Sequence, residues 1–112
     1  MDIASLFTDL EYGEKQPVIK VLINTNVVKE VRITFKKGQI MKAHKTSYPI
    51  VVEIVDGCIE FGLESENYIL KKGTLIALEA NVIHNLKAEQ DSIVRLSLNK
   101  SDAFERLQQL KA

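Results

Sequence analysis

The sequence has little of what marks a disulfide-stabilised, nucleic-acid-binding or membrane protein. Its single cysteine, Cys58, cannot form an intramolecular disulfide, which agrees with a reducing compartment. Fifteen basic residues balance fifteen acidic ones, so no net charge attracts nucleic acid or an anionic membrane. The first ten residues lack the basic start of a secretory signal, and no apolar run approaches membrane-spanning length. We therefore expect a cytoplasmic protein that binds neither nucleic acid nor membrane.

Common nucleotide-binding and thiol-enzyme motifs are also missing. Gly57, Gly62 and Gly73 are spaced as breaks between strands, whereas a phosphate-binding loop needs its glycines close together. Cys58 follows Gly57 at an expected strand start, and nothing near it in the sequence would activate a nucleophile. These patterns argue against a P-loop nucleotidase and against a thiol enzyme.

What the chain does have is a series of short segments with strand-like patterns. Between Val27 and Lys36, apolar and polar residues alternate, as in a strand buried on one face. Turn residues such as Asp56-Gly57 and Lys72-Gly73 separate the later segments. The expected strands are residues 18–24, 27–36, 39–46, 50–55, 58–63, 67–70, 74–79, 82–87 and 92–98.

Short strands at this spacing predict an all-β sandwich or closed barrel. A parallel α/β fold is disfavoured, because the sequence shows no helical pattern between the strands. With 112 residues, the chain has the size of one domain, whose barrel would span about residues 18–98. Two short helices are expected outside it. Ile3, Leu6, Phe7 and Leu10 recur at helical spacing near the N-terminus. A second such stripe near the C-terminus comprises Ala103, Phe104, Leu107 and Leu110.

Two glycine-led stretches carry a family resemblance. In the first, Gly38 is followed after five residues by His44, and the stretch closes at Gly57. In the second, Gly73 leads a strand and a turn that end at His84. In order and separation these stretches resemble the two motifs of the cupins. The resemblance implies an antiparallel cupin barrel, or jelly roll, with both histidines at one site.

The chain departs from the typical cupin pattern at two positions. A metal-binding cupin supplies two histidines and a glutamate from the first motif and one histidine from the second. Here Thr46 stands at the second histidine position and Pro49 at the glutamate position. The sequence is most similar to small cupins with a reduced His-Lys-Thr motif, here His44-Lys45-Thr46. That group is known mainly by its fold, so the resemblance implies no particular reaction.

Other side chains are candidates for completing the site. If Pro49 faces inward, strand alternation would also turn Glu53 inward as a third metal ligand; the equally apolar stripe of Ile50, Val52 and Ile54 leaves the opposite orientation open. Lys42, two residues before His44, would add positive charge, and Thr46 a hydroxyl group. Two imidazoles can bind a divalent transition metal, but a tight site usually needs three protein ligands.

The sequence leaves two functions open. The first is a noncatalytic protein that binds or senses a small polar or anionic molecule between His44 and His84, in a cavity partly lined by Val51, Val55 and Ile76. The second is a metal-dependent isomerase or oxygenase that uses both histidines, Glu53 and solvent. We also expect a homodimer, because a small barrel rich in apolar strand residues has a sheet surface to bury. Both histidines could instead be structural and bind nothing.

Overall fold

The computed structural model describes residues 1–100, which contain nine β-strands and no helix. Consequently, no helix in this part of the chain is long and apolar enough to cross a membrane. The strands match the segments expected from sequence to within about two residues at most ends. They are β1 (Val18–Asn24), β2 (Val28–Phe35), β3 (Ile40–His44), β4 (Ile50–Asp56), β5 (Cys58–Gly62), β6 (Asn67–Lys71), β7 (Leu75–Leu78), β8 (His84–Ala88) and β9 (Ser92–Asn99).

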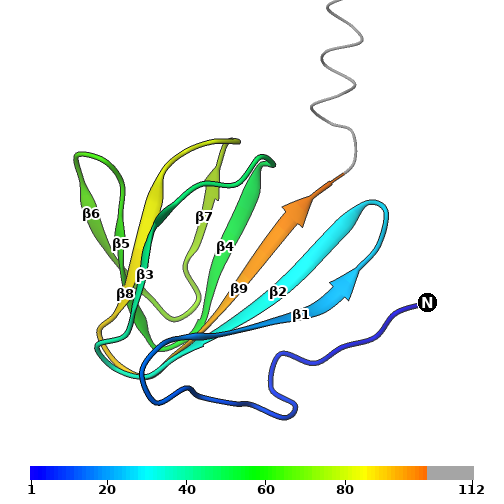
Figure 1. Ribbon diagram of the computed structural model, residues 1–112, viewed down its shortest axis with the longest axis horizontal. Helices are drawn as coiled ribbons and strands as arrows, with labels where there is room; N and C mark the ends of the chain where they lie inside the picture. Colours follow the sequence, from blue (N-terminus) through cyan, green and yellow to red (C-terminus); the bar gives the residue numbers. More distant parts are fainter. Residues whose placement is uncertain (101–112) are drawn as a thin grey trace, which may run out of the picture.

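The strands form two antiparallel sheets that face each other (Figure 1). One sheet has the order β1-β2-β9-β4-β7, and the other has the order β3-β8-β5-β6. From β2 onward, consecutive strands alternate between the sheets in the order of a jelly roll, except that β5 and β6 form an antiparallel pair within the smaller sheet. β1 extends the larger sheet beside β2. The all-β, antiparallel barrel or jelly roll expected from sequence is therefore confirmed.

Side-chain alternation along the strands places the core between the sheets. In β4, Ile50, Val52 and Ile54 are buried, while Val51 between them is exposed. The opposite sheet contributes the fully buried Ile59 and Phe61 of β5. The remaining buried members of this cluster are Val31, Ile33, Phe35, Leu78, Leu86, Ala88 and Val94.

The larger sheet is covered on part of its outer face by the N-terminal segment, residues 1–17. Arg32 of β2 is only 2% exposed, and its guanidinium donates hydrogen bonds to the carbonyl groups of Leu6, Thr8 and Asp9. The Thr34 hydroxyl donates to the carbonyl of Glu11. The middle of β2 is thus buried on both faces, although its alternating sequence predicts burial on one.

The short N-terminal helix expected from sequence is wrong. Residues 1–10 include bends and turns but no helix, and two members of the supposed apolar stripe, Ile3 and Phe7, are exposed. Arg32 occupies backbone carbonyls that a helix would use internally, and Asp9 adopts a left-handed conformation with φ of 51°. The C-terminal helix expected around Ala103–Leu110 lies outside the described residues.

Candidate functional site

His44 and His84 are direct neighbours across two strands. His44 is the last residue of β3, His84 is the first residue of β8, and the antiparallel register places them opposite each other. The centroids of the two imidazole rings are 4.3 Å apart, and the ring planes are inclined by 57°. The structure therefore brings together the two histidines that the sequence motifs single out.

Backbone hydrogen bonds determine which ring nitrogen of each histidine is free. Nδ1 of His44 lies 2.8 Å from the carbonyl oxygen of Lys42, and Nδ1 of His84 lies 2.9 Å from that of Val82. Because a carbonyl oxygen only accepts hydrogen bonds, each Nδ1 must carry the hydrogen and donate it. In the neutral imidazole, Nε2 then has a free lone pair. Both rings can consequently accept a hydrogen bond or ligate a metal through Nε2.

His84 is the more buried of the two histidines and lies in an apolar environment. Only 2% of the residue is exposed, and its ring stacks on Phe61 with centroids 5.6 Å apart and planes inclined by 11°. Burial lowers the pKa of His84, because apolar surroundings disfavour the imidazolium. The hydrogen bond to the Val82 carbonyl raises this pKa and the neighbouring His44 lowers it further, both by less than burial. His84 is therefore neutral near pH 7.

The free nitrogen of His84 has no hydrogen-bond partner in the part of the chain that the structure describes. Its Nε2 is buried, and no donor among residues 1–100 forms a hydrogen bond with it. Such an unsatisfied buried acceptor costs about 1–3 kcal/mol and is uncommon in native structures. A ligand, a water molecule or a cation bound at Nε2 would remove this cost.

A cavity of about 220 Å³ opens beside the two histidines, between the inner faces of the sheets. Its walls are largely aliphatic, and its polar side chains are His44, His84, Thr46 and Lys29. The apolar lining residues are Ile19, Val21, Val31, Ile33, Met41, Val52, Leu86, Val94, Leu96 and Leu98. A molecule in this space would meet a mainly apolar wall with the imidazole pair as its main polar feature.

Comparison with solved structures decides the fold. An RmlC-like cupin protein from Desulfovibrio desulfuricans superposes with a TM-score of 0.82 at 18% sequence identity, covering 89% of this chain and 97% of that one. A conserved protein with a double-stranded β-helix domain from Klebsiella pneumoniae gives a TM-score of 0.81 at 17% identity, covering 90% of this chain and 91% of that one. This chain has the cupin fold.

Another similar structure is a conserved protein of unknown function from Streptococcus pyogenes, with a TM-score of 0.76 at 22% identity, covering 90% of this chain and 89% of that one. No protein-family model matches the sequence, and no curated protein is significantly similar to it. At these identities the likeness concerns the cupin fold alone, and the chemistry of the site depends on its own residues.

The expectation that Lys42 joins the cupin cavity is wrong. Lys42 is exposed and does not line the cavity; only its backbone carbonyl takes part, by accepting from His44. The pairing of β3 with β8 shifts register between Met41 and His44. This irregularity breaks the two-residue alternation on which the expectation rested, and it lets Met41 and His44 line the same cavity.

Glu53 also lies outside the cavity, so its expected inward orientation is wrong. Ile50, Val52 and Ile54 take the inner face of β4, which turns Glu53 outward, where its carboxylate lies 3.7 Å from Nε of Arg95. Val51 and Val55, on the same alternation, do not line the cavity either. Ile76 packs against the core cluster but is not part of the cavity wall.

Thr46, the replacement for a usual cupin histidine, does line the cavity. Its hydroxyl donates a 2.7 Å hydrogen bond to the carbonyl of Tyr48 and so helps to hold the loop after β3. Met41 and Lys29 line the cavity as well, and sequence reasoning missed both. The spacing of Lys29 from the inward Val31 and Ile33 could have identified it; the irregular pairing that admits Met41 leaves no sequence signal.

The donor set of the cavity is small for a metal site. Among residues 1–100, no cluster of three or more His, Cys, Asp or Glu side chains could hold an ion. His44 and His84 alone supply two nitrogen ligands, whereas structural and catalytic zinc sites usually have at least three protein ligands. With Glu53 turned away, the residues present do not fit the usual cupin metal.

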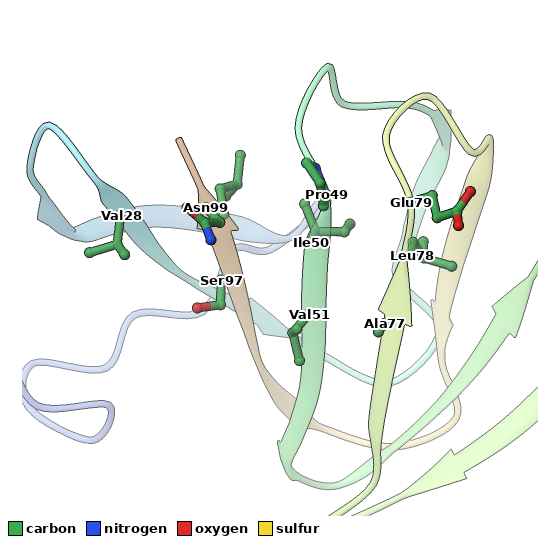
Figure 2. A pocket seen from close by; sticks show the side chains of 10 residues that line it. Val28, Pro49, Ile50, Val51, Ala77, Leu78, Glu79, Ser97 and Asn99 are labelled. Carbon is green, nitrogen blue, oxygen red and sulfur yellow. The ribbon is translucent and has the colours of Figure 1, made fainter. Parts of the chain in front are cut away.

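A second, wider hollow lies at one end of the larger sheet (Figure 2). Its volume is about 680 Å³, and its walls come from the ends of β2, β4, β7 and β9 and the adjoining loops. It is lined by Val28, Pro49, Ile50, Val51, Ala77, Leu78, Glu79, Ser97, Leu98 and Asn99. Neither histidine borders this hollow, so the larger space in the molecule lacks the imidazole pair.

Proposed function

We propose that this protein binds a small molecule, without transforming it, in the cavity beside His44 and His84. The observation that carries the proposal is the buried Nε2 of His84, which has no hydrogen-bond partner among residues 1–100 and belongs to a residue that lines a cavity large enough for a small organic molecule. Pockets that bind small molecules typically combine apolar walls with a few placed polar groups. A bound molecule that engages Nε2 would recover the free energy lost by burying an unsatisfied nitrogen.

The absence of an evident catalytic group beside the cavity supports binding over catalysis. Among residues 1–100, no carboxylate, thiol or tyrosine hydroxyl that could share proton transfer with the imidazoles lines the cavity. Cys58 lies in the first position of β5 and is not part of the wall. We also propose that this binding or sensing protein is cytoplasmic and homodimeric, as expected from the sequence.

A fragment screen on a matched pair of variants tests this function. Val21, on β1, lines the cavity and is 46% exposed, so Val21→Trp should fill the opening without disturbing the core. Val27→Trp is the control, because Val27 is 51% exposed and does not line the cavity. We expect fragments that bind the wild type, detected by ligand-observed NMR, to be lost with Val21→Trp and kept with Val27→Trp. Fragments unaffected by Val21→Trp would contradict the proposed site.

The alternative function is a metal-dependent isomerase or oxygenase of the cupin kind. The facing imidazoles favour it, since their Nε2 lone pairs are the ligand atoms that such a metal would need. With Glu53 on the outer face, solvent would have to complete the shell. Elemental analysis of protein purified without chelator separates the two functions. One tight equivalent of transition metal, lost with His44→Ala or His84→Ala, would favour the enzyme.

A further inference from the structure

We infer that the molecule bound in the cavity is neutral and largely apolar and donates a hydroxyl or N–H hydrogen bond to Nε2 of His84. This inference rests on the proposed function and narrows it to a ligand class, with simple phenols and alcohols as its plainest members. It replaces the polar or anionic ligand that the sequence alone suggested.

The direction of the hydrogen bond follows from the contacts of the ring. Nδ1 of His84 already donates to the Val82 carbonyl, 2.9 Å away, so the free Nε2 presents a lone pair. A carboxylate or the dianion of a phosphate monoester has only acceptors at its charged group and would set its own lone pairs against that nitrogen. A hydroxyl or N–H group supplies the donor that no described residue provides.

The charge state of the ring also disfavours an anionic ligand. Binding an anion would require an imidazolium, with a proton on Nε2 as well. His84 is only 2% exposed and its ring stacks on Phe61, so a second proton on the ring would place a poorly solvated charge in apolar surroundings. Within the described part of the chain, Lys29 is the one charged side chain that lines the cavity, so a carboxylate attracted by Lys29 is the competing chemistry.

The size and walls of the cavity define the rest of the ligand. Its volume of about 220 Å³ exceeds the ~150 Å³ of an engineered apolar cavity that binds benzene. The aliphatic side chains of β2, β8 and β9, among them Val31, Leu86 and Val94, would contact the body of the molecule. One substituted ring, or an aliphatic body of similar size, with a single polar donor therefore fits both the volume and the lining.

Three probes of similar shape test the inference: 4-ethylphenol, ethylbenzene and 4-ethylbenzoate, each titrated at pH 7.5 into protein treated with EDTA. We expect 4-ethylphenol to bind at least tenfold more tightly than either of the others. In His84→Phe, which keeps an aromatic ring beside Phe61 but removes the acceptor, 4-ethylphenol and ethylbenzene should bind equally. Val21→Trp should weaken every probe that occupies the cavity.

A measurement on the wild type keeps the test valid if His84→Phe does not fold. In long-range ¹H–¹⁵N spectra, the free protein should show His84 with hydrogen on Nδ1, and adding 4-ethylphenol should shift the Nε2 resonance upfield. No shift at saturation would overturn the inference.

The remaining outcomes separate the ligand class from the function. Equal binding of ethylbenzene and 4-ethylphenol, or tightest binding of 4-ethylbenzoate, would overturn the ligand class. If that binding were still lost with Val21→Trp, the proposed function would stand. A failure of all three probes to bind at millimolar concentration, together with a fragment screen without hits, would overturn both.

Discussion

Among single residues, Gly57 and Gly38 form a matched pair for testing how closely the chain is packed. Both have positive φ, 92° and 88°, which favours glycine. A Cβ on Gly57 would lie 2.2 Å from Oγ of Ser92 and 2.4 Å from the carbonyl oxygen of Asp91, whereas a Cβ on Gly38 would meet nothing within 4 Å. The two positions therefore share the backbone strain and differ in the steric clash.

We predict that Gly57→Ala lowers the free energy of unfolding by about 3 kcal/mol or more and Gly38→Ala by about 1 kcal/mol, as measured by urea denaturation. The added cost at Gly57 comes from moving Ser92, whose Oγ also accepts the backbone N–H of Cys58 at 3.0 Å. If the two variants lost the same free energy of unfolding, the backbone around Ser92 would have to move at little cost to accommodate the added Cβ, and this prediction would be wrong.

His84 should make the stability of the protein depend on pH. Its pKa is lower in the folded state than the usual 6.5, so below pH 6.5 the unfolded state binds more protons than the folded state. Stability is then fully present above pH 6.5 and falls as the pH decreases toward the folded-state pKa. The slope contributed by one such group is at most about 1.4 kcal/mol per pH unit.

Comparing His84→Phe with the wild type by urea denaturation at pH 7.5, 6.5 and 5.5 isolates this effect. We expect the wild type to lose stability relative to the variant as the pH falls, and His44→Gln to retain the pH dependence, because His44 is less buried. A constant stability difference between wild type and His84→Phe would contradict the buried neutral imidazole.

The sequence predicts the histidine pair well and its surroundings poorly, for identifiable physical reasons. The resemblance of two stretches to the cupin motifs implies that His44 and His84 meet, and the pairing of β3 with β8 places them opposite each other. The orientation of Glu53 depends on which of two apolar stripes of β4 is inward, and packing against the opposite sheet decides it. The position of Lys42 depends on a register shift that leaves no trace in composition.

At the scale of elements, the buried cation Arg32 makes the largest number of side-chain hydrogen bonds that hold the N-terminal segment against β2. The Arg32 guanidinium lies 2.8 Å from the carbonyl oxygen of Thr8, 3.2 Å from that of Asp9 and 3.3 Å from that of Leu6. Each hydrogen bond to a charged group contributes about 1.5–3 kcal/mol net to stability. Here the three bonds also satisfy the buried charge of the Arg32 guanidinium. Detaching the segment would expose the outer face of β2.

We predict that Arg32→Met lowers the free energy of unfolding by about 2–4 kcal/mol and makes the first 17 residues susceptible to proteinase K. Arg95→Met is the control, since Arg95 pairs with Arg32 in the register of the same sheet. The Arg95 side chain is 40% exposed and forms ion pairs with Glu30 and Glu53, so its loss should cost no more than about 1 kcal/mol. A segment that resists proteolysis in Arg32→Met would show that other contacts hold it.

The strands could be predicted, because alternation and turn residues are local signals in the sequence. The conformation of the N-terminal segment could not be predicted, because contacts with distant residues decide it. Its helical spacing of Ile3, Leu6 and Phe7 is a real pattern, but a short isolated helix is marginal in water. Contacts with Arg32 and Thr34, more than twenty positions away, supply the stronger alternative for its carbonyl groups. The same long-range contacts turn the half-buried β2 into a strand covered on both faces.

At the scale of the whole molecule, the outer face of the larger sheet is protected unevenly. The N-terminal segment covers the part around Arg32, whereas the part formed by β4 and β7 carries exposed apolar side chains. Val51 is 40% exposed, and Leu75, on the edge strand β7, is 63% exposed. Val51 and Ala77 also line the hollow at this end of the sheet (Figure 2). An uncovered apolar face beside an open strand edge is a common site of association.

We therefore predict that the chain forms a homodimer through this face, with a twofold arrangement in which β4 and β7 of each copy are covered. The double variant Val51→Lys and Leu75→Lys should be monomeric in sedimentation experiments at micromolar concentration, because association would bury unpaired ammonium groups.

Ile69→Lys is the control: Ile69 lies on β6 of the smaller sheet and is 56% exposed, so this variant should remain dimeric. A monomeric wild type would exclude the dimer, and dissociation by Ile69→Lys alone would place the interface on the smaller sheet. Since neither substituted residue lines the histidine cavity, the monomeric variant should still bind the cavity probes, which separates assembly from ligand binding.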